Sequence, residues 1–147
     1  MRQLSSEIEI NATPERVWQI LTDFPALKDW NPFIASIEGE PLQDEKLRVR
    51  IEPPGGMGMS FSPTILKAEP GVELRWIGRV LMPGLFDGEH SFTIEQLGDG
   101  RVRFIQGEKF TGVLVPLMGL MGVYKSTAAG FEAMNQALKE RAERPEG

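Results

Sequence analysis

The longest regular pattern in the chain is an amphipathic helix near the C-terminus. Over residues 115–143, apolar residues recur three and four positions apart, which is the spacing of one helical face. At about 1.5 Å per residue such a helix would be about 43 Å long, enough to cross a small domain. Residues 117–124 are almost entirely apolar, whereas residues 131–142 carry charged side chains on one side. We predict one helix whose second half packs on a sheet and whose first half forms a pocket wall.

Seven strands and two short helices are predicted before that helix. Residues 4–10 alternate between apolar and polar as a half-buried strand does. Thr13 and Pro14 have the chemistry of an N-cap and a first helical turn, and this helix should run to about Thr22, followed by a second helical turn at 26–30. The remaining strands are predicted at 33–38, 46–52, 60–68, 72–81, 85–97 and 101–111. This order indicates an α+β fold with an antiparallel sheet.

The last two predicted strands can be aligned by requiring that their apolar residues face one core. Aromatic residues occupy even-numbered positions on both strands, so the numbers of paired residues must add to an even sum. A three-residue loop at 98–100, which pairs Leu97 with Arg101, satisfies this requirement. It also places His90 opposite Glu108, with Cβ atoms about 4.5–5.5 Å apart. The only histidine of the chain should therefore face a glutamate on the inner side of the sheet.

Three interpretations of this polar pair remain open. It can be a structural pair that satisfies a buried carboxylate, or a set of polar groups that orients a ligand in an apolar pocket. It can also be a general acid/base pair, although no nucleophile or third orienting group is visible. Met118 and Met121 fit either a core or a plastic cavity lining, and Trp30 fits either a plug at the end of the fold or a cavity rim. The residues expected to contact a ligand are Trp30, Trp76, His90, Phe92, Gln106, Glu108, Phe110, Leu117, Met118, Met121 and Tyr124.

Composition narrows the range of partners. The 147 residues are enough for one domain with a core, and 41% apolar with 25% charged residues is typical of globular chains. The net charge of -5 and the lack of a basic cluster argue against nucleic acid. The absence of cysteine excludes disulfides and fits a reducing, cytoplasmic compartment. No second histidine or spaced carboxylate cluster indicates a metal, and no cofactor is expected.

Membrane and phosphate-binding signals are missing from the sequence. The longest apolar run, at residues 113–124, is shorter than the about 20 residues that a membrane span needs. Glu7 and Glu9 interrupt any apolar core of a signal peptide. The glycine-rich stretch at 55–59 is followed by no Lys-Ser/Thr pair, so it predicts a hairpin turn or a pocket lip rather than a phosphate loop. The expected assembly is a monomer or a homodimer.

Seven short stretches carry residue combinations that occur together in one superfamily. They are residues 13–18, 21–24, 30–33, 74–76, 83–92, 108–112 and 131–135. These stretches resemble the START-like (SRPBCC) superfamily, and within it the small bacterial proteins of the polyketide cyclase/dehydrase type. The resemblance implies a helix-grip fold, in which a seven-stranded antiparallel sheet curls around a long C-terminal helix and two short helices follow the first strand. It also implies a cavity for an apolar ligand between sheet and helix, but no shared catalytic residues.

The sequence leads to a single START-like domain over residues 1–147 and to two functional hypotheses. The first is binding of a small hydrophobic ligand, namely a lipid, a polyketide or an aromatic compound, between the sheet and the C-terminal helix. The alternative is an enzyme of the polyketide cyclase/dehydratase type, in which His90 and Glu108 act as the acid/base pair. A protein-interaction role would require a large exposed apolar patch, for which the sequence offers no clear candidate.

Overall fold

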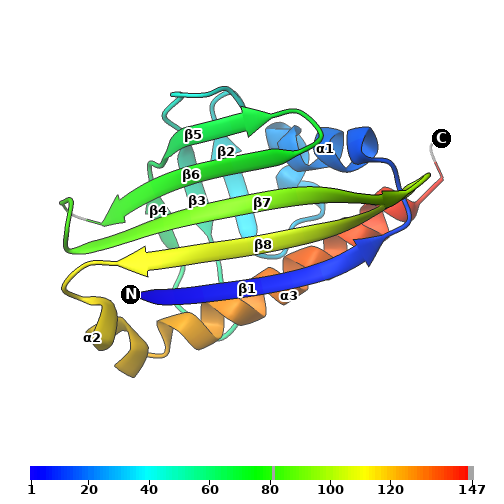
Figure 1. Ribbon diagram of the computed structural model, residues 1–147. Coiled ribbons are helices and arrows are strands. Elements are labelled where there is room, and N and C mark those ends of the chain that lie inside the picture. The colour runs from blue at the N-terminus through cyan, green and yellow to red at the C-terminus, as the bar shows by residue number, and fades with distance from the viewer. Residues whose placement is uncertain (81, 146–147) are drawn as a thin grey trace.

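Two antiparallel sheets and a long helix make up the α+β fold of the computed structural model, which describes residues 1–80 and 82–145 (Figure 1). The larger sheet has the strand order β1-β8-β7-β6-β5, and the smaller has the order β2-β3-β4. The larger sheet contains β1 (Arg2–Ile10), β5 (Thr64–Glu69), β6 (Glu73–Val80), β7 (Phe86–Gly98) and β8 (Arg101–Thr111). The smaller contains β2 (Ile34–Glu38), β3 (Arg48–Ile51) and β4 (Met59–Phe61). The helices are α1 (Pro14–Thr22), the 3-10 helix η1 (Phe24–Asp29), α2 (Val115–Leu120) and α3 (Val123–Glu143).

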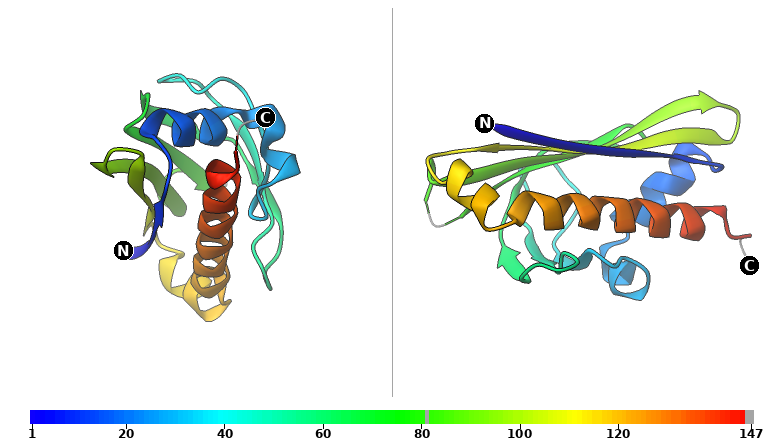
Figure 2. Two further views of the ribbon diagram at one scale, coloured as in Figure 1. Left: turned by 90° about the vertical axis from the view of Figure 1, so that its right-hand side faces the viewer. Right: turned by 90° about the horizontal axis from the view of Figure 1, so that it is seen from below.

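Helix α3 runs along the inner face of the larger sheet and has the smaller sheet on its other side (Figure 2). The even-numbered residues of β6, β7 and β8 point toward it, as the alternating pattern predicts. Among the largest fully buried side chains are Trp76, Phe92 and Phe104 from the sheet and Phe131 from the helix. The sheet and the helix therefore share one apolar core.

The prediction of a single seven-stranded sheet is wrong, although the α+β class and the antiparallel pairing are confirmed. The predicted strand 60–68 is divided, because Pro63 has no N–H group for a sheet ladder and interrupts the run. Strand β4 ends before this proline and pairs with β3, whereas β5 begins after it and pairs with β6. The described ranges thus contain eight strands in two sheets. Position 81, the predicted end of the strand at 72–81, lies outside the described residues.

The predicted register of the last hairpin is confirmed at its inner positions. His90 pairs with Glu108, and Phe92 pairs with Gln106. The loop differs from the prediction, because Gly98 rather than Leu97 pairs with Arg101 and a bulge absorbs the extra residue. The alternation fixed the register of the strands without fixing the geometry of the turn.

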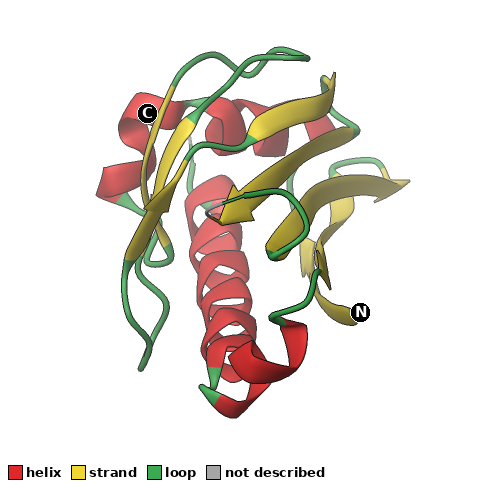
Figure 3. Cartoon of the chain, turned by 90° about the vertical axis from the view of Figure 1, so that its left-hand side faces the viewer, coloured by secondary structure: helices red, strands yellow, loops and turns green. Residues whose placement is uncertain are grey.

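The prediction of one continuous helix over 115–143 is also wrong. Gly122 has a φ of 76°, a left-handed conformation that ends α2 and begins α3 in a new direction. Figure 3 shows α2 as a separate helical segment turned away from the axis of α3. As a result, Leu117 and Met121 are 48% and 65% exposed, instead of facing the sheet. The first helices match the prediction better: the Arg16 N–H donates to Thr13 Oγ1 at 3.1 Å and caps α1.

The C-terminal end of α3 is fastened to the turn after β1 by a carboxylate. The Asn11 N–H donates to Glu143 Oε2 at 2.8 Å, and Lys139 Nζ donates to the same oxygen at 2.6 Å. The hydrogen bond from Asn11, followed by that from Lys139, holds the pKa of Glu143 below its ordinary value of 4.5. The folded state therefore favours the ionised carboxylate more than the unfolded chain does.

Replacing Glu143 with glutamine should destabilise the protein in a pH-dependent way. A lowered folded-state pKa gives stability that is complete above the unfolded-state pKa and is lost as the pH falls through the folded-state pKa. We expect Glu143→Gln to lower the free energy of unfolding by about 0.5 kcal/mol at neutral pH, because the group is partly exposed, and by less below about pH 4. Urea unfolding at a series of pH values measures this difference. Glu140→Gln on the same turn is the control. If Glu143→Gln lowered the free energy of unfolding equally at every pH, the ionised Glu143 carboxylate would not be the source of the stability.

Candidate functional site

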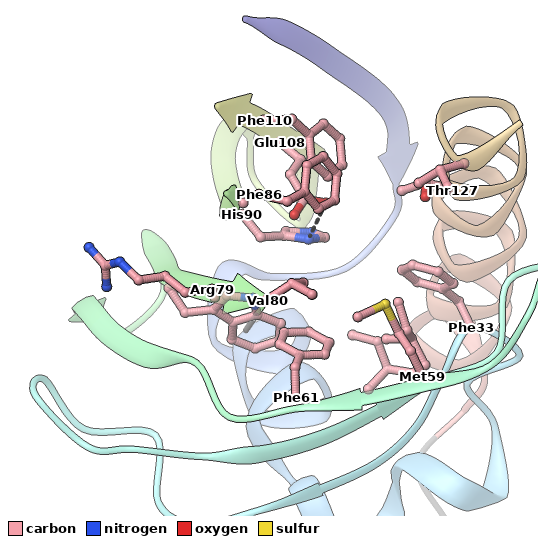
Figure 4. Close-up of a pocket in the computed structure, with 16 residues that line it drawn as sticks. Phe33, Met59, Phe61, Arg79, Val80, Phe86, His90, Glu108, Phe110 and Thr127 are labelled. Atoms are coloured by element: carbon pink, nitrogen blue, oxygen red, sulfur yellow. Dashed lines mark ion pairs between the residues drawn. The ribbon is translucent and has the colours of Figure 1, made fainter. Parts of the chain in front are cut away.

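A cavity of about 80 Å³ lies between the two sheets and α3. Figure 4 shows aromatic side chains on opposite sides of it, with Phe86 and Phe110 from the larger sheet and Phe33 and Phe61 from the region of the smaller sheet. Val123 and Thr127 of α3 close a further side. The polar side chains that line it are Arg79, His90, Glu108 and Thr127. The cavity is therefore an apolar space with a few polar groups, which is the usual character of a small-molecule site.

Two paired glycines let side chains from other strands approach the larger sheet closely beside the cavity. Gly78 on β6 pairs with Gly88 on β7, and both line the cavity. A Cβ atom on Gly88 would lie 2.5 Å from Glu108 Oε2, and one on Gly78 would lie 3.0 Å from a ring carbon of Phe61. The space that the two missing side chains leave is therefore taken by the Glu108 carboxylate and the Phe61 ring, which both line the cavity. The sequence signal for this close approach is a glycine at an inward position on each of two neighbouring strands.

Strands β4 and β6 face each other across one side of the cavity without forming a ladder. Strand β4 pairs with β3 alone, and the neighbours of β6 are β5 and β7. Met59 and Phe61 reach the cavity from β4, while Arg79 and Val80 reach it from β6. In the described residues this side is therefore closed by side chains and not by backbone hydrogen bonds.

His90 is buried against the floor of the cavity and contacts polar groups through both ring nitrogens. Its Nδ1 lies 3.5 Å from Glu108 Oε1, and its Nε2 lies 3.0 Å from Gln106 Oε1. The ring stacks on Phe92 at 4.2 Å between centroids and meets the edge of Phe131 at 4.9 Å. Only 3% of the residue is exposed, so the surrounding rings hold the imidazole in one orientation.

Gln106 determines which nitrogen of His90 carries a proton. Its Nε2 group donates to Asn135 Oδ1 at 2.7 Å and to the backbone oxygen of Phe131 at 3.3 Å. A backbone carbonyl can only accept, so the amide nitrogen of Gln106 must face it and the amide oxygen must face His90. His90 Nε2 is therefore the donor in the contact with Gln106. Asn135 in turn donates to Ser6 Oγ at 3.1 Å, which ties the network to β1.

The structure brings four of the predicted ligand-contacting residues to the cavity: Trp76, His90, Glu108 and Phe110. Two further predicted residues, Phe92 and Gln106, contact His90 from behind and do not line the cavity themselves. Phe92 stacks on the His90 ring, and Gln106 forms a hydrogen bond with that ring.

The other five predicted residues are not brought to the cavity. Tyr124 is buried in a second apolar cluster, where its hydroxyl donates to Val115 O at 2.7 Å, and Met118 packs against this cluster. Leu117 and Met121 are 48% and 65% exposed, because the break at residue 122 turns α2 away from the sheet. Trp30 packs against the main core. The helical wall of the cavity comes from Val123 and Thr127 in the first turns of α3 and not from α2.

Five of the twelve cavity residues that the prediction missed come from the smaller sheet or the residue just before it. Phe33, Ile34, Ile51, Met59 and Phe61 line the cavity from this side. Their pattern in the sequence predicts strands, but it does not say which surface those strands cover. Among residues 1–80 and 82–145, no group of three or more potential ligands is arranged to hold a metal ion. None of the helices in the same ranges has the length and apolar character that crossing a bilayer requires.

Known protein structures share the fold of this chain, and a family model matches its sequence. The family model described as polyketide cyclase/dehydrase and lipid transport matches residues 1–143. The Zhui aromatase/cyclase from Streptomyces sp. R1128 has 16% sequence identity and a TM-score of 0.78, with 97% of this chain and 94% of that chain covered. A START superfamily protein from Mycobacterium smegmatis has 24% identity and a TM-score of 0.72, with 96% and 97% covered.

A synthase has the same fold at lower sequence identity. Norcoclaurine synthase from Thalictrum flavum, in complex with dopamine and hydroxybenzaldehyde, has 10% identity and a TM-score of 0.72, with 99% of this chain and 89% of that chain covered. Identities this low describe the fold alone. No curated protein matches the chain closely enough to count as a relative.

Proposed function

The chain belongs to the polyketide cyclase/dehydrase and lipid transport family, and from this membership we propose that it binds a small hydrophobic molecule in the cavity between the larger sheet and α3. The observation that carries the proposal is the apolar cavity between the two sheets and α3, which lies beside the pair of His90 and Glu108. A sheet that served only as scaffold would gain stability from filling that space, because an unfilled cavity forfeits packing contacts. An unfilled space lined by aromatic rings therefore supports a binding role.

The size of the cavity favours an aromatic compound over a lipid or a long polyketide. For comparison, an apolar cavity of about 150 Å³ in another protein accepts benzene. At about 80 Å³, the present cavity matches a single ring after small side-chain movements better than it matches an acyl chain.

Filling part of the cavity should weaken binding. We expect a fluorescent apolar probe to bind the native protein and to quench tryptophan emission, because Trp76 lines the cavity. A Cβ atom on Gly78 would already lie 3.0 Å from the Phe61 ring, so the larger side chain of Gly78→Leu should displace this ring and fill part of the cavity. We expect this to weaken binding at least tenfold, the cost of about 1.4 kcal/mol of lost contacts. Gly98→Leu is the matched control, because a Cβ atom at Gly98 meets no atom within 4 Å. Equal probe binding by the native protein and Gly78→Leu would refute the proposed site.

A cyclase or dehydratase activity is the second candidate function, and the pair of His90 and Glu108 at the cavity favours it. A histidine beside a carboxylate can remove and return a proton on a bound carbonyl compound. A binding protein returns its ligand unchanged, whereas a dehydratase releases water from it. Mass spectrometry of a cyclic hydroxyketone after incubation separates the two functions, with His90→Ala as the variant that should stop any conversion.

A further inference from the structure

We propose that the ligand is a small aromatic compound with a hydroxyl group, and that Glu108 Oε2 accepts the hydrogen bond of that hydroxyl. This inference rests on the proposed binding function and adds the chemistry of the ligand to it.

The two oxygens of Glu108 have different surroundings. Oε1 lies 3.5 Å from His90 Nδ1, and it is the atom that forms the pair. Oε2 lies over Gly88, at 2.5 Å from the place that a Cβ atom would occupy. Among the described residues, Oε2 has no hydrogen-bond or ion-pair partner, although Glu108 lines the cavity and its side chain is only 15% exposed. This oxygen borders the cavity with free lone pairs, so it can accept a hydrogen bond from a donor on the ligand.

The proton arrangement of the pair makes Oε2 an acceptor. Gln106 requires the proton on His90 Nε2, so Nδ1 is left to face Glu108 Oε1. A lone pair on Nδ1 opposite an ionised oxygen would be repulsive, so one proton lies between the two groups. It belongs either to an imidazolium beside a carboxylate or to a protonated Oε1 beside a neutral imidazole. In both cases Oε2 keeps its lone pairs and no proton, and its partner must be a donor.

The remainder of the cavity favours a neutral donor on a ring. Phe86 and Phe110 stack with centroids 5.2 Å apart and an angle of 8° between their planes, so they present flat apolar surfaces. Trp76 and Phe61 add further aromatic surface. A hydroxyl loses less hydration energy than an ammonium group on entering such a space. A phenol-type compound satisfies both the rings and the free carboxylate oxygen.

Calorimetric titration with phenol and anisole tests the inference. The two compounds share the ring and the oxygen, but the methyl ether has no proton to donate. We expect the native protein to prefer phenol by at least tenfold, because hydrogen bonds to charged groups are among the stronger ones. Glu108→Leu should bring the two affinities to near equality while anisole still binds. Glu89→Leu, which changes a carboxylate at a neighbouring odd-numbered position of β7, is the control and should keep the preference.

A second measurement keeps the test decisive if Glu108→Leu fails to fold. The chain has one histidine, so nitrogen-15 NMR reports on His90 alone. In the native protein, phenol should shift the Nδ1 signal and anisole should leave it nearly unchanged. Equal binding of phenol and anisole, or a phenol preference that survives Glu108→Leu, would overturn the hydroxyl inference and leave the binding function standing. Failure of both compounds and of the apolar probe would overturn the binding function itself.

Discussion

Replacing Gln106 with leucine should lower the free energy of unfolding by about 3 kcal/mol, although leucine has a similar shape and is more apolar. Gln106 is fully buried, and its amide serves His90 Nε2 on one side and Asn135 Oδ1 on the other. Leucine leaves both of these groups buried without a partner, and each such group costs about 1–3 kcal/mol. Urea denaturation followed by circular dichroism measures the loss.

The control for this variant is Gln136→Leu. Gln136 is exposed on α3 and forms a hydrogen bond with Glu140 across one helical turn. Its replacement should change the free energy of unfolding by less than about 0.5 kcal/mol, which is usual for exposed positions. If Gln106→Leu proved as mild as Gln136→Leu, the buried amide network would not contribute to stability. The nitrogen-15 signals of His90 should also change in Gln106→Leu, because the group that fixes its tautomer is gone.

Replacing Gly130 with alanine should destabilise the protein, against the preference of helices for alanine. Gly130 lies inside α3, where alanine is favoured over glycine by about 1 kcal/mol. An added Cβ atom would overlap the ring of Phe33, which is 3% exposed and packs edge-on against Phe131. Overpacking of this kind costs about 1–3 kcal/mol and in severe cases more, so we expect a net loss of about 2 kcal/mol. For a chain of this size, that corresponds to a fall in Tm of about 6 °C.

Thermal unfolding of two single variants, Gly130→Ala and Gly119→Ala, separates the steric clash with Phe33 from the preference of helices for alanine over glycine. A Cβ atom on Gly119 would meet the Tyr124 ring at 3.4 Å, which is an ordinary contact. Gly119→Ala should therefore be neutral or stabilising by up to about 1 kcal/mol. A rise in Tm for both variants would show that Phe33 moves aside easily. Because Phe33 also lines the cavity, Gly130→Ala should weaken probe binding as well.

The register of the last hairpin could be predicted because the sheet has one buried face. Shifting either strand by one residue would have turned Phe92 and Phe104 toward solvent, so the alternation allowed few solutions. The break between α2 and α3 could not be read in the same way, because apolar residues continue on both sides of Gly122. The split at Pro63 was equally hidden, since a proline in a strand indicates an edge or a bulge as readily as a change of sheet.

The candidate site was predictable where it depended on pairing and not where it depended on packing. His90 and Glu108 face each other across two hydrogen-bonded strands, and sequence parity is enough to place them. Phe61 reaches the cavity only because β4 folds over β6, and Leu117 leaves it only because α2 turns away. These outcomes depend on how separate elements meet in space, which a linear pattern does not record.

The lack of a hydrogen-bonded ladder between β4 and β6 in the described residues determines where the cavity can widen most easily. Widening the cavity within the larger sheet would break backbone hydrogen bonds between neighbouring strands. Widening it between β4 and β6 would cost only the contacts of side chains such as Met59 and Phe61. A molecule somewhat larger than a single ring would therefore enter by moving β4 and β6 apart. The free-energy cost of this movement would rise gradually with the size of the molecule. The protein should rank ligands by width along a smooth scale, while the fixed carboxylate at Glu108 imposes a sharp chemical choice.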